Sequence, residues 1–404
     1  MTAESEAIRV QYPWLARLAV VGIGIMAVGC LVAPDRLWPN LLLGAYYVLT
    51  LALGGAVFVA LTDVSGAGWH VAFRRVPEAL ARLLPLASLL LAIVLLLGMG
   101  RYGWPHDGDH VPGTFRFKEL WLTPTFWAAR TVGYLVFWMW LARSITARSA
   151  AQDQPGSTAE TAANVRLSAL FLAIYAVTFS LASIDWIMAL EPLWFSTMWG
   201  VYHFAGMFQS TLAVVILLAL AWRQDHGPLA GIFRDDHLHD LGRLLLGFSC
   251  FWMYIWFCQY MLIWYSNLPE ETSYFITRTH GPWGPVVIAS VVLNWLLPFF
   301  LLLPKPAKRS AGAMARIAVL VLIGRWVDLY VMIFPATLTA TDAQGVVHAL
   351  PPTFGIWEAA TLLGLATATA FCLSRTFLAR PPVPRSDPFL REPSLAPCNS
   401  GSLP

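Results

Sequence analysis

Ten apolar stretches, each about long enough to cross a bilayer, limit what this chain can fold into. They fall at about 15–33, 40–62, 82–100, 124–142, 165–188, 198–222, 243–266, 284–303, 314–335 and 354–373. A hydrocarbon core of about 30 Å requires roughly 20 residues of helix, and each stretch meets that length. The sequence therefore predicts an all-α polytopic membrane protein with about ten transmembrane helices.

Positive charge falls on alternate connections between these stretches. The first, third, fifth, seventh and ninth connections hold only five of the 26 Lys and Arg residues, namely Arg36, Arg101, Arg116, Lys118 and Arg278. Arg74, Arg75 and most of the others lie on the opposite side. The positive-inside rule then places both termini and the basic connections in the cytoplasm. A missed helix would scramble this split, so the charges also favour a count of ten.

Composition excludes several classes of protein. Hydrophobic residues make up 58% of the chain and charged residues 12%, against about 25% charged in soluble domains. A net charge of +3 that arises from the basic side does not indicate nucleic acid binding. The five cysteines form no C-x-x-C or C-x-x-C-H motif, so we expect no metal site, iron–sulfur cluster or attached haem in this chain.

The chain divides into three predicted parts. Residues 1-14 form a cytoplasmic N-terminal segment, 15-375 the ten-helix membrane domain, and 376-404 a disordered, proline-rich cytoplasmic tail. A small, polar linker between the fourth and fifth stretches separates two halves. Stretches two to five and six to nine are each a candidate four-helix unit. The long outward connections 102–123 and 267–283 look like contact surfaces or caps over a site.

Ionisable residues inside the stretches are the first candidates for function, because each costs about 2.5–3.5 kcal/mol to insert. Arg325 and Asp328 lie in the ninth stretch. Their spacing of three puts them on one helix face, where they can pair and lower each other's desolvation cost. Two interpretations stay open, a structural ion pair and a part of a proton path.

A second group of candidates lies near the outer ends of the fifth and sixth stretches. Asp185 and Glu191 follow one another there, and His203 enters the next helix. A carboxylate beside a histidine suits quinol oxidation, in which two protons leave with the electrons. The same groups also suit a water-filled proton channel, and Asp185 alone suits a structural cap. Arg130 supplies a cation that can pair with one of these acids.

The seventh stretch leads into two adjacent acids, Glu270 and Glu271. Acids at the start of an outward loop are usually solvated. If they are covered by the loop, they are candidates for a proton exit or a partner contact. Four aromatic side chains near these groups are candidates for contact with a quinone: Trp186, Tyr202, Tyr260 and Trp264.

Two long motifs carry a resemblance to a known family. They are SIDWIMALEPLWFSTMWGVYHFAG at 183–206 and FWMYIWFCQYMLIWYSNLPEETSYF at 251–275, with RTHGPWGP at 278–285 and GRWVDLYVMIFPA at 324–336 in agreement. The chain resembles the second, smaller quinone-binding-type membrane subunit of alternative complex III, a bacterial quinol:cytochrome c (or other periplasmic acceptor) oxidoreductase. That subunit is similar to the polysulfide-reductase membrane-subunit (NrfD-like) superfamily. The likeness covers about residues 15–375.

The resemblance implies two four-helix bundles with two peripheral helices. It implies a bacterial cytoplasmic membrane location, and partners that comprise a larger sister membrane subunit, an iron–sulfur protein and c-type cytochrome subunits. Electrons would travel through those partners, so this chain would not be catalytic alone, and quinol is a possible ligand. The family motifs make seven residues candidates for a quinone-proximal or proton-conducting route: Asp185, Glu191, His203, Glu270, Glu271, Arg325 and Asp328. One departure is Leu193, where many relatives are expected to have His.

Three other classes of protein are alternatives to a quinol oxidoreductase subunit with a quinone or proton role. A purely structural scaffold subunit of the same complex would account for buried charges that are paired. A stand-alone secondary transporter would place substrate groups at the midplane, whereas most polar residues here gather toward the outer half. Haem-copper oxidases and di-haem cytochromes b are excluded, because only His203 of nine histidines lies clearly within a stretch and bis-His haem needs two.

Overall fold

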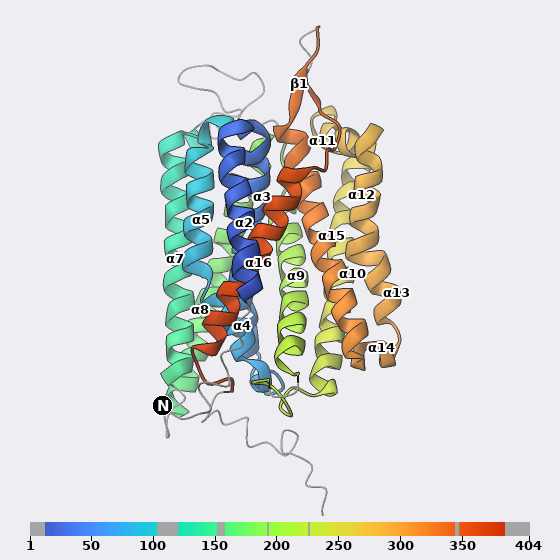
Figure 1. The fold of residues 1–404 in the computed structure, drawn as a ribbon. Coiled ribbons are helices and arrows are strands. Elements are labelled where there is room, and N and C mark those ends of the chain that lie inside the picture. The colour runs from blue at the N-terminus through green and yellow to red at the C-terminus, as the bar shows by residue number, and fades with distance from the viewer. Residues whose placement is uncertain are drawn as a thin grey trace, which may run out of the picture.

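The computed structural model describes residues 13–102, 120–151, 158–191, 194–224, 227–343 and 347–383. Several expectations fall wholly or partly outside these ranges: most of the N-terminal segment, residues 103–119 of the outward connection with Arg116 and Lys118, residues 152–157 of the linker, Leu193, and the tail from residue 384 with Cys398. The described residues form long helices that stand side by side (Figure 1). Nine of these helices are long and apolar enough to cross a membrane.

All ten predicted stretches are helical. The long helices are α2 (Pro13–Val32), α3 (Pro34–Val64), α5 (Leu84–Leu97), α7 (Pro124–Ala151), α8 (Thr158–Trp186), α9 (Trp199–Trp222), α10 (Asp235–Ser266), α12 (Gly284–Val291) continued through η5 (Val292–Leu296) into α13 (Leu297–Leu302), α15 (Ala311–Thr337) and α16 (Ile356–Leu378). The tenth, α7, is less apolar than the nine and runs beside α5 and α8. The all-α polytopic membrane fold is therefore confirmed.

Shorter elements join or cap the long helices. They are η1 (Val71–Phe73), α4 (Arg75–Ala81), η2 (Met99–Arg101), η3 (Met188–Leu190), α11 (Pro269–Thr279), η4 (Gly281–Trp283), α14 (Lys305–Arg309), and the antiparallel strands β1 (Thr339–Thr341) and β2 (Val347–Ala349). The β1–β2 hairpin was not predicted. It stands with α11 at one end of the molecule (Figure 1), which we call the outer end. The opposite end, which carries α14 and the start of α4, is called the basic end.

The helices group into two bundles. The first bundle contains α3, α4–α5, α7 and α8, and the second contains α9, α10, α12–α13 and α15. Helix α3 joins them by packing against α9 and α15. Between Leu37 and Ala60 nearly every residue of α3 is buried, as expected for a helix that is apolar all round. The grouping agrees with the two four-helix units that the sequence predicted.

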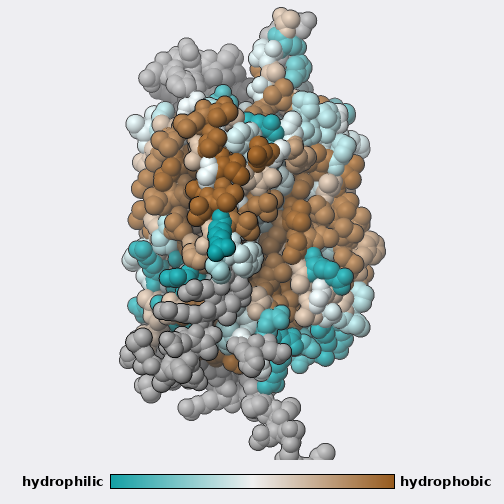
Figure 2. Space-filling view, viewed as in Figure 1, coloured by the Kyte–Doolittle hydropathy of each residue, from teal (hydrophilic) through white to brown (hydrophobic). Residues whose placement is uncertain are grey.

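Helices α2 and α16 lie outside the two bundles and pack closely on each other. A Cβ atom added to Gly22 would lie 2.4 Å from the Cα atom of Gly364, so glycines at both positions allow the two backbones to meet, as small residues do in membranes. Helix α16 crosses obliquely over α3 (Figure 1). On this face Figure 2 shows an apolar belt around the middle of the molecule, with polar residues toward both ends. The belt is the surface that lipid contacts.

Candidate functional site

Arg325 and Asp328 form the predicted ion pair in the interior of the second bundle. The guanidinium Nη1 atom lies 2.5 Å from Asp328 Oδ2, and both residues are buried. Asp328 Oδ1 accepts a hydrogen bond from the Tyr202 hydroxyl of α9, and Oδ2 accepts one from the Trp252 indole of α10, at 3.3 Å. Donors from three helices therefore meet on one carboxylate, which a spacing argument along α15 alone does not reveal.

The Arg325 guanidinium is only partly bonded. Its Nε and Nη2 atoms are buried and have no hydrogen-bond partner among the described residues. Gly206 of α9 makes room for the group, because a Cβ atom there would lie 2.4 Å from Arg325 Nη1. Buried N–H groups without a partner cost free energy. This side of the pair is therefore suited to exchange partners with water or with a proton acceptor.

The midplane of the second bundle carries further polar atoms that are incompletely bonded. Gln209 donates from Nε2 to Ser249 Oγ (2.9 Å) and to the Asn294 carbonyl (2.6 Å). The side-chain oxygens of Gln209 and Asn294 are buried without a partner in the described part of the chain. Asn294 lies in the π-helical segment η5, a local rearrangement that is frequent at functional sites. The segment turns Asn294 toward Gly324 of α15.

His203 is buried one residue after Tyr202 in α9. Its Nδ1 atom lies 2.7 Å from the Tyr46 hydroxyl of α3, and its Nε2 atom has no partner among the described residues. The expected pairing of His203 with Asp185 is not seen. His203 bonds instead to Tyr46 of α3, and the Asp185 carboxylate is bonded by other donors. The histidine is thus a link between the bundles.

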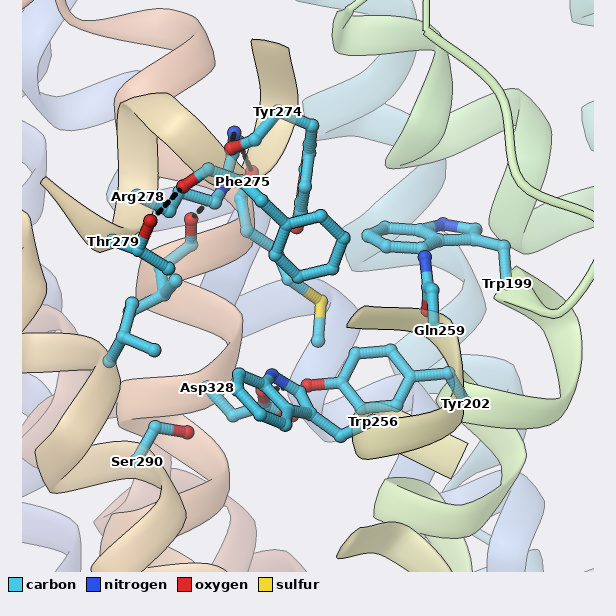
Figure 3. A pocket seen from close by; sticks show the side chains of 13 residues that line it. Trp199, Tyr202, Trp256, Gln259, Tyr274, Phe275, Arg278, Thr279, Ser290 and Asp328 are labelled. Carbon is cyan, nitrogen blue, oxygen red and sulfur yellow. Dashed lines mark hydrogen bonds between the residues drawn. The ribbon is translucent and has the colours of Figure 1, made fainter. Parts of the chain in front are cut away.

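A small cavity lies on the outer side of Asp328 (Figure 3). Its walls come from α9, α10, α11, α12 and α15, with Tyr202 and Asp328 on one side, Arg278 and Thr279 on another, and Gln259 from α10. The volume open to the centre of a water molecule is about 20 Å³. That is enough for one water. The cavity therefore extends from Asp328 toward the outer end of the molecule.

Arg278 closes the cavity from the α11 side. Its guanidinium donates to the carbonyls of Tyr274 (3.1 Å), Val331 (2.9 Å) and Met332 (3.0 Å), and lies 2.5 Å from Glu191 Oε1. The group also lies 3.6 Å from the Tyr274 ring centroid. From its position in the sequence, Arg278 was counted only as a charge on an outward connection, and this role was not predicted. The RTHGPWGP motif that begins at this residue was the available signal.

Asp185 occupies the corresponding outer half of the first bundle. Its carboxylate accepts two hydrogen bonds from Arg130, at 2.9 and 3.0 Å, one from Trp121 Nε1 at 2.7 Å and one from the Tyr134 hydroxyl at 3.2 Å. Arg130 also lies over the Trp121 ring, 3.8 Å from its centroid. The expectation that Arg130 pairs with one of the acids is confirmed. With four donors around it, the Asp185 carboxylate is fully bonded.

The remaining candidates do not gather at the cavity. Trp186 is buried in the first bundle and donates to Thr131 Oγ1 at 3.0 Å. Trp264 is 67% exposed on α10. Tyr260 stacks on Trp256, which lines the cavity. Of the four aromatic candidates, Tyr202 alone contributes directly to the cavity wall.

Glu270 and Glu271 lie in the first turn of α11. Glu270 is exposed and Glu271 is half-buried, with Ser266 Oγ 3.5 Å from its carboxylate. Negative side chains at a helix N-terminus are stabilised by the backbone dipole. The interpretation of this pair as a solvated helix start is therefore the better one.

A buried ionic network that was not predicted lies at the basic end of the first bundle. Arg74 bridges Asp63 (2.9 Å) and Glu78 (3.0 Å), and Arg75 lies 2.6 Å from Glu78. Ser168 Oγ of α8 donates to Asp63 at 3.1 Å, and Ser149 of α7 donates to Glu78. Arg74 and Arg75 are thus buried, although the alternating charge pattern counted them among the positive charges of a basic connection. The spacing of Glu78 from them, three and four residues, was the available signal.

His70 lies in the connection between α3 and η1, beside this network. Its ring is buried among aromatic side chains, with the ring centroid of Phe58 6.3 Å away. Burial first, and the neighbouring Arg74 charge second, lower the pKa of His70 to about 3. The side chain is therefore neutral at physiological pH.

No protein-family model matches the chain, and no curated protein matches it.

Proposed function

We propose that this chain is an integral membrane subunit of a quinol:cytochrome c, or other periplasmic acceptor, oxidoreductase, and that it supplies a proton route while partner subunits carry the electrons. One observation carries the proposal: the partly bonded Arg325–Asp328 pair borders a cavity whose opposite wall is Arg278. Arg278 in turn holds Glu191 near the outer surface. The resemblance in the two long motifs supplies the assignment to a quinol oxidoreductase.

The residues around the cavity can hold and pass a proton. Asp328 is within hydrogen-bond reach of the Tyr202 hydroxyl and of Arg325, so its protonation changes both contacts. One water in the cavity would lie between the acid and the wall formed by Gln259 and Arg278. The Glu191 side chain is 27% exposed and provides a carboxylate at the outer end. Carboxylates placed in this way serve proton relays in membrane proteins.

Cavity size favours the proton route over a quinone site at this position. A volume of about 20 Å³ holds a water molecule and not an aromatic ring. Trp186 and Trp264, two of the quinone-proximal candidates, lie away from the cavity. In this proposal a quinol is oxidised at a neighbouring subunit, and the present chain receives or releases its protons.

The proposed setting follows the resemblance. The chain would lie in the bacterial cytoplasmic membrane with both termini in the cytoplasm, beside a larger sister membrane subunit. An iron–sulfur protein and c-type cytochrome subunits would hold the redox groups. The outer end, with α11 and the β1–β2 hairpin, would face the partners on the periplasmic side.

A structural scaffold subunit is the second candidate, and the Asp185 site favours it. Four donors bind that carboxylate, which leaves nothing for proton exchange. If all buried ion pairs of the chain only stabilise the fold, the protein positions its partners and carries no protons. The two candidates differ in what substitution of Asp328 does.

The first experiment is affinity purification of the chain from its native membrane in mild detergent. Mass spectrometry of co-purifying proteins and a reduced-minus-oxidised haem spectrum are recorded on the product. We expect multihaem cytochrome and iron–sulfur subunits with quinol oxidation activity. A haem-free chain that purifies alone would contradict the proposal and favour a transporter.

The second experiment separates the proton route from the scaffold. Asp328→Asn is expected to lower turnover and quinol-linked proton release while the complex still assembles. Glu270→Gln, an exposed acid at the same end, is the matched control and is expected to leave both unchanged. Arg325→Ala is expected to impair assembly more strongly, because it leaves Asp328 buried without its cation. Normal proton release in an intact Asp328→Asn complex would reject the proton role.

A further inference from the structure

Two arginines at the basic end stand apart from the buried ionic network. Arg82 lies in the turn between α4 and α5, and Arg380 follows the end of α16, which packs against α4. Both are half-buried. The Nε and Nη2 atoms of Arg82 are buried and have no hydrogen-bond partner among the described residues. Arg380 donates from Nη1 to the Thr146 carbonyl of α7, at 3.0 Å.

The charges around Arg82 leave it without a counter-ion. The positive charges of Arg380 and Arg75 repel that of Arg82, and Glu78 attracts it. Both oxygens of Glu78 are already bonded, to Arg74, Arg75 and Ser149. Among the described residues no salt bridge joins Arg82 to a carboxylate. Two like charges that are half-buried together are stabilised by an anion placed between them.

An exposed apolar stripe continues from Arg82 along α5. Arg82 lies in the turn just before α5. Leu86, Leu89 and Ile93 follow within the helix at spacings of three and four residues, which puts these three side chains on one face of α5. The three apolar side chains are 56%, 59% and 47% exposed. Because α5 is a membrane helix, this stripe faces lipid. A ligand with a phosphate at one end and hydrocarbon beyond it fits the arginines and the stripe together.

We propose that Arg82 and Arg380 bind the phosphate of an anionic phospholipid, whose acyl chains lie along Leu86, Leu89 and Ile93 of α5. Guanidinium groups match phosphate oxygens in charge and in the geometry of their N–H groups. Basic pockets between membrane helices on the cytoplasmic side are sites for such headgroups. The basic end is the end that the charge pattern predicts to face the cytoplasm. This inference does not depend on the proposed redox role.

The test uses the full chain in mild detergent, with added cardiolipin, phosphatidylglycerol, phosphatidylcholine or inorganic phosphate. Ligand binding to the folded state raises Tm. We expect cardiolipin and phosphatidylglycerol to raise Tm, and phosphatidylcholine and inorganic phosphate to have much smaller effects. An equal effect of inorganic phosphate would overturn the lipid assignment and leave a simple anion site.

Substitutions locate the effect. Arg82→Gln and Arg380→Gln are each expected to weaken the cardiolipin response about tenfold in concentration or more, the loss of a charged hydrogen bond. Arg148→Gln, an exposed arginine of α7 at the same end, is the matched control and is expected to respond as the wild type does. Equal responses of all three variants would overturn the proposal.

A measurement on the unaltered protein covers the case in which the variants do not fold. Native mass spectrometry of the wild-type chain is recorded after incubation with an equimolar mixture of phosphatidylglycerol and phosphatidylcholine. We expect retention of phosphatidylglycerol in clear excess. Equal retention of the two lipids would contradict a phosphate-selective site. Leu89→Gln, which makes the lipid-facing stripe polar, is expected to lower retention of both.

Discussion

The Arg130–Asp185 pair of the first bundle and the Arg325–Asp328 pair of the second are both buried in the outer half of the molecule. They are bonded differently. Arg130 binds both carboxylate oxygens and the Trp121 carbonyl, and its ring contact with Trp121 covers the rest of the group. Arg325 binds its acid through Nη1 only, and its other two nitrogens have no partner among the described residues.

How completely each pair is hydrogen-bonded helps to tell a structural ion pair from a functional one in a membrane interior. A buried ion pair recovers its desolvation cost only when its hydrogen-bonding groups are satisfied. The pair in the first bundle meets that condition and has no capacity for another partner. The pair in the second bundle does not meet it, and it borders a water-sized cavity. In the proposed function the first pair serves stability and the second serves proton exchange.

The largest expected effect is on stability in the first bundle. Arg130→Met leaves the Asp185 carboxylate buried without its cation, and is expected to lower the free energy of unfolding by about 3–5 kcal/mol. Thermal unfolding of the detergent-purified chain measures this loss. Arg101→Met is the matched control, because the Arg101–Asp35 pair at the outer end is exposed and exposed pairs contribute little. If the two variants unfold alike, the first pair is not structural.

The second effect tests the space around Arg325. Gly206→Ala places a methyl group against the guanidinium and is expected to cost about 1–3 kcal/mol by overpacking, with a loss of proton release in the assembled complex. Gly247→Ala of α10, where an added Cβ meets nothing within 4 Å, is expected to gain up to about 1 kcal/mol in helix stability. Equal stability and equal proton release of the two variants would mean that Arg325 has room to move. The proposed difference between the two ion pairs would then lose this support.

The third effect extends the comparison to the basic end of the first bundle. The pKa of His70 is about 3 in the folded state and about 6.5 when exposed, so the unfolded chain binds more protons between these values. The contribution of neutral His70 to the free energy of unfolding is complete above pH 6.5. It decreases as the pH drops toward 3, by at most about 1.4 kcal/mol for each pH unit. Tm measured at pH 7 and at pH 5 is expected to fall less for His70→Gln than for the wild type. An unchanged difference would show that other groups control acid stability.

The smallest effect concerns the acids that the structure leaves outside both pairs. Glu270→Gln removes one negative charge from the first turn of α11, and is expected to lower the free energy of unfolding by a few tenths of a kcal/mol through the helix dipole. Thermal unfolding at low salt is the measurement, because salt screens this contribution. A loss comparable with that of Arg130→Met would make Glu270 part of a buried network and would weaken the contrast between the two pairs.

The helices, their grouping into two bundles and the Arg325–Asp328 pair could be predicted from the sequence. The partners of that pair could not. Tyr202 and Trp252 lie 126 and 76 residues from Asp328 along the chain, and no periodicity connects them. Arg278 was missed for a related reason: it lies on an outward connection, and only the fold of α11 over the bundle buries it.

The basic-end network shows a limit of charge counting. Arg74 and Arg75 contribute to the alternating pattern from which the orientation is predicted, yet both are buried with Asp63 and Glu78. The positive-inside rule depends on which side of the membrane a cation lies. It does not depend on whether the cation is exposed there. The orientation argument and the burial of these residues are therefore compatible.

Features that depend on neighbours along the chain can be inferred from the residues alone: helix length against membrane thickness, the alternation of basic connections, and the shared helix face of residues three apart. Which carboxylate is fully bonded follows instead from the packing of the folded helices. That outcome depends on how many donors distant helices bring to each acid, four for Asp185, and on whether a glycine such as Gly206 leaves a guanidinium room. Those are properties of packing between helices, which local spacing does not encode.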